Sequence, residues 1–114
     1  MERKEHLSSA KDYERLSELA RDTKSKANTI FYAAIEHIEA ILANYDIHSS
    51  SHEDRGKTIL NLEISGPFTK DSYKNYEELI RKRNLAGYRG INGKNIESLK
   101  KLLQFFKGVK IGTK

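Results

Sequence analysis

The sequence predicts an all-α protein: an antiparallel up-and-down helical bundle of four to five helices in one domain, residues 1–114. Apolar residues recur at three- and four-residue steps in five segments, which is the spacing of one face of an α-helix. The connections between these segments are short, so successive helices should run antiparallel. A chain of this length is usually one domain. We expect residues 1–8 and 108–114, at the two ends, to be loose.

The first helix is predicted over residues 9–22, where Ala10, Tyr13 and Leu16 begin an apolar repeat that Leu19 continues. A serine before this repeat is a suitable N-cap. Residues 23–26 lack apolar positions and predict a turn. One continuous helix through them is the alternative, because no glycine or proline intervenes.

The second helix, residues 27–44, has the widest apolar stripe and is predicted to be the central helix of the bundle. The stripe consists of Ala27, Ile30, Phe31, Ala34, Ile35, Ile38, Ile41, Leu42 and Tyr45. His37 lies on its flank. Since the reference pKa of histidine lies near neutrality, His37 is a candidate for binding or for proton transfer, although flank histidines are more often structural.

His48 and His52 are four residues apart beside two acidic residues, which raises the question of a metal site. Two imidazoles at this spacing bind a metal well only from a helix, and the serines between them favour a loop. We therefore predict no metal and no cofactor. Ser51, followed three residues later by Asp54, predicts instead the start of a helix that runs from His52 to residue 61 or 64.

Two further helices complete the bundle. Thr69 is a suitable N-cap for a helix over residues 70–85, and a last helix should run from residue 92 or 93 to 106. The alternating residues 60–64 resemble a strand, but a single strand would have nothing to pair with. They are therefore assigned to the third helix, with Ile59 and Leu60 inward.

Charge divides unevenly along the chain. Residues 1–65 hold 9 Lys and Arg against 12 Asp and Glu, a net −3, whereas residues 66–114 hold 12 against 4, a net +8. The basic half favours a polyanion such as RNA, or an acidic protein, as partner, and a merely solvated lysine-rich surface is the alternative. There is no cysteine. No apolar run is long enough to span a membrane and no leader peptide is recognisable, so we expect a cytoplasmic protein without a membrane partner.

The stretch Arg81–Gly90 concentrates the candidate site residues, which are Arg83, Asn84, Tyr88 and Arg89. Cations at a helix C-terminus are expected on electrostatic grounds alone. Arg83 is different because an apolar turn follows it, where a guanidinium must find a partner or stay at the surface.

The layout resembles the HEPN superfamily of small all-α prokaryotic proteins. The similar features are Phe31-Tyr32-Ala33-Ala34 in the second helix, a His-rich connection, and Arg83-Asn84 at a helix end, followed by a closing amphipathic helix. The resemblance implies a homodimer and a motif of Arg, four to six residues, then His, with which active members cleave RNA without metal. It also implies a minimal nucleotidyltransferase as a partner, as in toxin–antitoxin-like pairs. Tyr88 occupies the position of the motif histidine, and in some related pairs a nearby tyrosine is nucleotidylated.

No histidine follows His52, so the motif histidine is missing. The reference pKa of tyrosine is about 10, too high for efficient proton transfer at neutral pH. We therefore expect a catalytically weak or inactive module that binds RNA, a nucleotide or a nucleotidyltransferase partner through Arg83, Asn84, Tyr88 and Arg89. Two alternatives remain. One is a metal-independent ribonuclease in which Tyr88 or His37 moves the proton, and the other is a purely structural or oligomerisation bundle.

Overall fold

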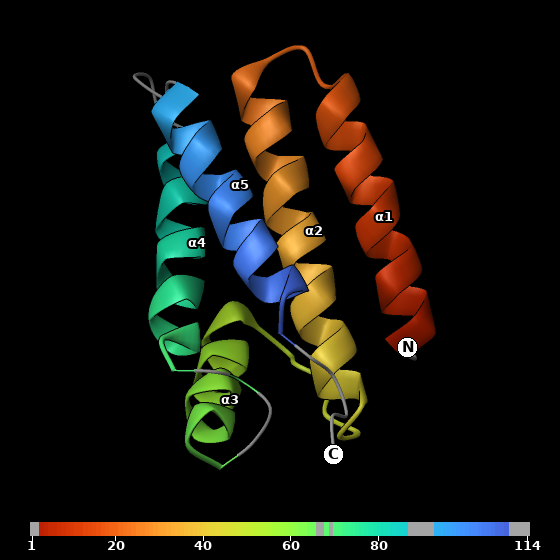
Figure 1. The fold of residues 1–114 in the computed structure, drawn as a ribbon, viewed down its shortest axis with the longest axis vertical. Coiled ribbons are helices and arrows are strands. Elements are labelled where there is room, and N and C mark those ends of the chain that lie inside the picture. The colour runs from red at the N-terminus through yellow and green to blue at the C-terminus, as the bar shows by residue number, and fades with distance from the viewer. Residues whose placement is uncertain (1–2, 66–67, 69, 87–92, 110–114) are drawn as a thin grey trace.

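The computed structural model describes residues 3–65, 68, 70–86 and 93–109, and within these ranges the chain is an all-α bundle without a strand (Figure 1). The predicted fold class is thus confirmed. The five helices are α1 (Arg3–Leu19), α2 (Thr23–Ala43), α3 (His52–Ser65), α4 (Ser72–Ala86) and α5 (Gly93–Lys107).

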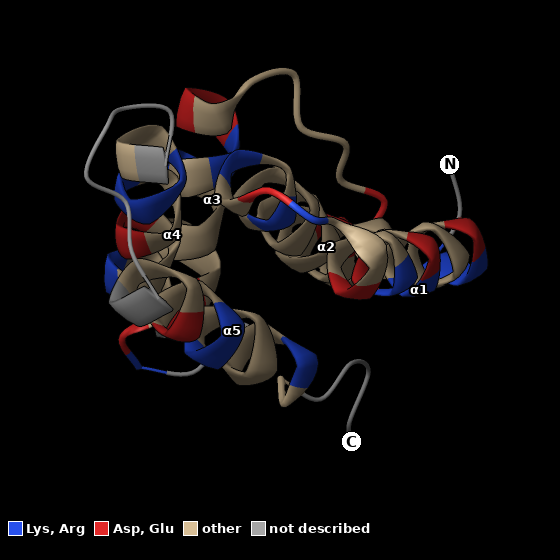
Figure 2. Cartoon of the chain, turned by 90° about the horizontal axis from the view of Figure 1, so that it is seen from above, with Lys and Arg blue, Asp and Glu red and all other residues tan. Residues whose placement is uncertain are grey.

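The arrangement is a three-helix centre with two additions. Helices α2, α4 and α5 pack against one another, whereas α1 packs on α2 and α3 packs on α4. Figure 1 shows the four long helices running up, down, up and down, with α3 below them beside the start of α4. Seen from above in Figure 2, α1 and α4 lie on opposite sides of α2.

Helix α2 is the central helix, as its wide apolar stripe predicts. Eleven of its residues are buried, including Phe31, Ile38 and Leu42. Fully buried alanines such as Ala33 and Ala40 allow neighbouring helices to approach closely. Tyr45 was predicted to join the stripe but is 43% exposed, because the helix ends two residues earlier.

The connection between α1 and α2 differs from the prediction. Asp22 is the N-cap of α2 and accepts a hydrogen bond from the Ser25 backbone N–H at 2.8 Å. An N-cap carboxylate satisfies a backbone donor that has no partner inside the helix. Residues 23–26 therefore form the first turn of α2 rather than a loop, and the turn is the short stretch from Ala20 to Asp22.

Helix α1 starts six residues earlier than predicted, at Arg3, so residues 3–8 are not loose. The reason is a long-range contact: the His6 ring nitrogen lies 2.6 Å from a Glu36 carboxylate oxygen on α2. Leu16 and Leu19, predicted to face inward, are 50% and 69% exposed. Because the backbone of α1 packs closely only on α2, α1 buries a narrower stripe than its sequence offers.

Helix α3 begins where Ser51 predicts, since the Ser51 hydroxyl accepts a hydrogen bond from the Asp54 backbone N–H at 3.0 Å. Residues 60–64 are helical, as predicted. Ile59 is buried, but Leu60, predicted inward, is 43% exposed because α3 packs on a single helix. The Glu63 carboxylate accepts a hydrogen bond from the Tyr73 backbone N–H in the first turn of α4, where a negative charge is favourable.

The remaining boundaries lie close to the predictions. Helix α4 begins two residues late, at Ser72, and the predicted N-cap Thr69 lies outside the described residues. After α5, Val109 is only 6% exposed, so residues 108 and 109 belong to the packed structure rather than to a loose tail. Residues 110–114 lie outside the described part of the chain.

Each of the five helices contains both basic and acidic residues, which are coloured blue and red along the backbone in Figure 2. In the described part of the chain, no helix is both long and apolar enough to cross a lipid bilayer.

The packing predicts unequal effects of two Leu→Ala substitutions. Leu99 on α5 is fully buried, so Leu99→Ala should lower the free energy of unfolding by about 2–5 kcal/mol through lost burial and a cavity. Leu19→Ala, at an exposed position, should change it by less than about 0.5 kcal/mol. Urea unfolding followed by circular dichroism measures both, and similar effects at the two positions would contradict the packing.

Candidate functional site

The candidate site is centred on Arg83, in the last turn of α4. Its guanidinium carbon lies 4.5 Å from the centre of the Phe31 ring on α2, which is a cation–π contact. The side chain is half-buried, and its Nε is buried without a hydrogen-bond partner among the described residues. Within the same residues no carboxylate forms an ion pair with Arg83. The ring therefore positions a cation whose Nε–H has no acceptor among the described residues.

His52, the first residue of α3, contacts the same aromatic ring. The centres of the His52 and Phe31 rings are 5.6 Å apart and their planes are nearly perpendicular, at 79°. Phe31 thus carries Arg83 on its face and His52 near its edge. Three helices, α2, α3 and α4, contribute one residue each to this arrangement.

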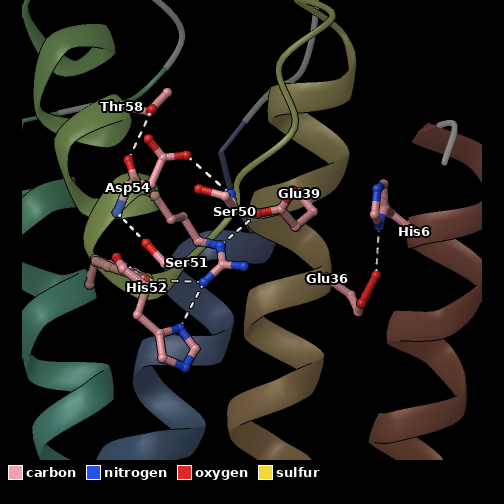
Figure 3. A network of polar contacts seen from close by, with 10 residues as sticks. His6, Glu36, Glu39, Ser50, Ser51, His52, Asp54 and Thr58 are labelled. Atoms are coloured by element: carbon pink, nitrogen blue, oxygen red, sulfur yellow. Dashed lines mark hydrogen bonds and ion pairs between the residues drawn. The ribbon is translucent and has the colours of Figure 1, made fainter.

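Arg55 fixes His52 in place (Figure 3). Its Nε donates a hydrogen bond to Glu39 Oε2 at 2.6 Å, and its Nη1 lies 2.8 Å from His52 Nδ1. Nη1 also donates to the Tyr76 hydroxyl, and this hydroxyl donates to the His52 carbonyl oxygen at 2.9 Å. The side chains of Arg55 and Glu39 are only 11% and 10% exposed. Glu39, which lies off the main apolar stripe of α2, is buried because it pairs with this arginine.

The hydrogen bonds define the protonation state of His52. A guanidinium can only donate, so His52 Nδ1 must accept, and the single proton of the neutral ring is on Nε2. Burial, with the nearby charges of Arg55 and Arg83, lowers the pKa of His52 below its ordinary value. His52 is therefore a neutral hydrogen-bond donor through Nε2–H at pH 7.

The same geometry limits proton transfer at this site. The acceptor nitrogen of His52 is occupied by Arg55, and the lowered pKa of the ring makes it a weak base. Burial raises the pKa of Tyr76, even though the hydrogen bond from Arg55 opposes this shift. Both side chains are thus suited to binding rather than to acid–base catalysis.

The predicted site residues do not all come together. His37 lies apart from Arg83, six residues beyond Phe31 and thus about 120° around the axis of α2. Its Nε2 is 3.4 Å from Glu14 Oε2 on α1. Lys107 Nζ, on α5, donates a hydrogen bond to Glu14 Oε1 at 2.8 Å. Burial lowers the pKa of His37 despite the neighbouring Glu14. His37 therefore belongs to a contact between α1 and α5.

Asn84 follows Arg83 on α4 and is exposed, and no described contact brings it to Phe31. Tyr88 and Arg89 lie outside the described residues, so their predicted part in the site is untested. His48 precedes α3 rather than sharing a helix with His52. Among the described residues, no group of three or more His, Asp or Glu side chains is arranged to hold a metal ion.

His52 and Arg55 are site residues that sequence reasoning missed. A local signal for them existed, because Ser51 places His52 in the first turn of α3 and residues three apart on a helix face the same side. Their meeting with Arg83 depends instead on how α3 packs on α4, which no local pattern records.

Comparisons of this chain with protein-family models, with curated proteins and with solved structures find no match. The resemblance to the HEPN superfamily therefore remains a prediction.

The pKa of His52 offers a test of this geometry. NMR titration should show His52 protonating below pH 6.5, its ordinary value, and its neutral form should carry the proton on Nε2. Replacing Arg83 by Gln removes a nearby positive charge, so the pKa of His52 should rise towards that value. An unchanged pKa in Arg83→Gln would show that the two groups do not interact.

The lowered pKa of His52 also affects the stability of the folded chain. Because the unfolded chain takes up a proton on His52 at higher pH than the folded chain does, the free energy of unfolding should fall as the pH drops from 7 through the pKa of unfolded histidine. His52→Gln should make this fall smaller.

Proposed function

We propose that this chain is a HEPN-like module that binds RNA through its phosphates at Arg83 and has little or no capacity to cleave it. The observation that carries the proposal is a half-buried guanidinium, positioned on an aromatic ring, without an ion-pair partner among the described residues. Such a cation costs free energy until an anion satisfies its donors. A planar guanidinium matches the oxygens of a phosphate, and charge-assisted hydrogen bonds of this kind are strong.

A neighbouring group supports an anion at this position. The Nε2–H of His52, whose ring contacts Phe31, is a second donor. Positive charge also predominates in the part of the chain that contains α4 and α5. RNA is a polyanion, and contacts to its phosphates supply much of the affinity of proteins that bind it.

Weak cleavage follows from the protonation states of the site. Cleavage next to the 2′-hydroxyl of RNA requires one group to remove a proton and another to supply one. His52 has its acceptor nitrogen occupied, and burial raises the pKa of Tyr76. The homodimer and the nucleotidyltransferase partner that the resemblance implies remain predictions.

Arg83→Ala should weaken binding of a short single-stranded RNA by roughly tenfold to a hundredfold, since it removes a charge-assisted hydrogen bond. The slope of log affinity against log salt should also fall by about 0.7, the loss of one phosphate contact. Fluorescence anisotropy across a salt series measures both quantities.

Arg81→Ala is the matched control, because Arg81 is an arginine on the same helix but is exposed and paired with Glu78. Its effect on affinity should be less than about threefold, as for an exposed, screened charge. Equal losses in the two variants would contradict a specific site at Arg83. Arg83-dependent cleavage of the RNA, with or without chelator, would favour the ribonuclease alternative instead.

A further inference from the structure

A groove between α3 and α4 adjoins the candidate phosphate site. Its volume is about 330 Å³, within the range of small-ligand pockets. It is lined by His52, Gly56 and Lys57 from α3 and by Tyr73, Tyr76 and Ile80 from α4, with a glutamate from each helix at its edge. His52 belongs both to this groove and to the contact with Phe31, so the groove and the Arg83 site share this residue.

One face of α4 runs from the groove to Arg83. Tyr73, Tyr76, Ile80 and Arg83 follow one another at steps of three and four residues, which places them along the same side of the helix. Ten residues, about 15 Å along the helix axis, separate Tyr73 from Arg83. A single strand that contacts both residues must therefore reach over more than one nucleotide.

The chemistry of the groove suits a flat, neutral ring better than a second phosphate. Tyr73 and Ile80, which are partly exposed, supply apolar surface, whereas Tyr76 is only 2% exposed. Every nucleobase has a π-face that stacks on a ring such as that of Tyr73. Gly56 lets these two rings pack closely against α3, since a Cβ at this position would lie 3.3 Å from the Tyr76 ring and 3.6 Å from the Tyr73 ring. The edge of the groove carries two carboxylates, Glu53 and Glu77, which disfavour an anion there.

Both hydrogen-bond acceptors and hydrogen-bond donors line the groove. Glu77 accepts a hydrogen bond from the Tyr73 hydroxyl at 2.9 Å through Oε2, and its carboxylate can also accept from an exocyclic amine or ring N–H of a base. Lys57 supplies a donor. A nucleobase, which presents donors and acceptors along one edge, fits this mixture.

We propose that the groove between α3 and α4 binds a nucleobase of a single-stranded RNA that also places a phosphate on Arg83. The proposal rests on the function proposed above and adds to it a base-binding subsite, which requires unpaired rather than duplex RNA. The base stacks against Tyr73, and the phosphate on Arg83 belongs to another nucleotide of the same strand. A base in a duplex is stacked and paired, so it cannot enter the groove.

The test compares two RNAs of four nucleotides that have the same phosphates, one with uracil at every position and one abasic throughout. Wild-type protein should bind the RNA with bases at least about fivefold more tightly, as expected from stacking of one base. Tyr73→Leu, which keeps apolar bulk but removes the ring, should abolish this difference. Tyr73→Phe should retain it, and Arg83→Ala should weaken the binding of both RNAs.

A crosslinking measurement keeps the test independent of how well the variants fold. A strand that carries 4-thiouracil should, on irradiation, attach to wild-type protein within the peptide that contains Tyr73 and Tyr76. Attachment only elsewhere would overturn the proposal. If wild-type protein binds the abasic RNA as tightly as the RNA with bases while Arg83→Ala weakens both, the groove is not a base site and the phosphate site stands. If neither RNA binds, the proposed function fails, and the groove proposal fails with it.

Discussion

The buried ion pair between Glu39 and Arg55 is the interaction on which the rest of the site depends. Helix α3 packs on α4 but makes few backbone contacts with α2, so this pair is the polar link from α3 to the central helix. Arg55 also bonds Tyr76 on α4 and His52 at the start of its own helix. Removing one partner of such a pair typically costs about 3–5 kcal/mol, because the remaining charge stays buried. One guanidinium thus ties three helices together.

This link places two otherwise unrelated side chains around Phe31. His52 is fixed by its hydrogen bond to Arg55, and Arg83 is fixed by its contact with the aromatic face. Arg55 carries a full carboxylate partner, whereas Arg83 has none among the described residues. Arg55 is therefore a structural cation, whereas Arg83 is available to a ligand. His52 is kept neutral because burial and two positive charges all disfavour its protonation.

The sequence predicted best those features that depend on a single helix. The apolar stripe of α2 identified the central helix, and Ser51 identified the start of α3, because periodicity and capping are local properties. Local signals failed to predict burial, because burial depends on how many helices pack against a residue. Leu16 and Leu19 have the right spacing for burial, yet α1 packs its backbone closely only on α2 and leaves them exposed.

In the site, too, some residues could be identified from the sequence and others could not. Arg83 could be selected from the sequence because an apolar turn follows it, and its contact with an aromatic ring is consistent with that reasoning. His52 could not be selected, because its proximity to Arg83 arises from residues about thirty positions apart in the sequence. His37 was selected for its chemistry alone, and the structure places it in a separate contact with Glu14.

The central claim is that the Arg83 guanidinium is an anion-binding group held on Phe31. Its most direct measurement is the NMR signal of the arginine side-chain Nε–H groups, recorded while inorganic phosphate and then a short single-stranded RNA are added. The account predicts a saturable shift of the Arg83 signal at concentrations that leave the signals of Arg81 and Arg55 nearly unchanged. An Arg83 signal that does not move, or that moves only together with the exposed Arg81, would contradict it.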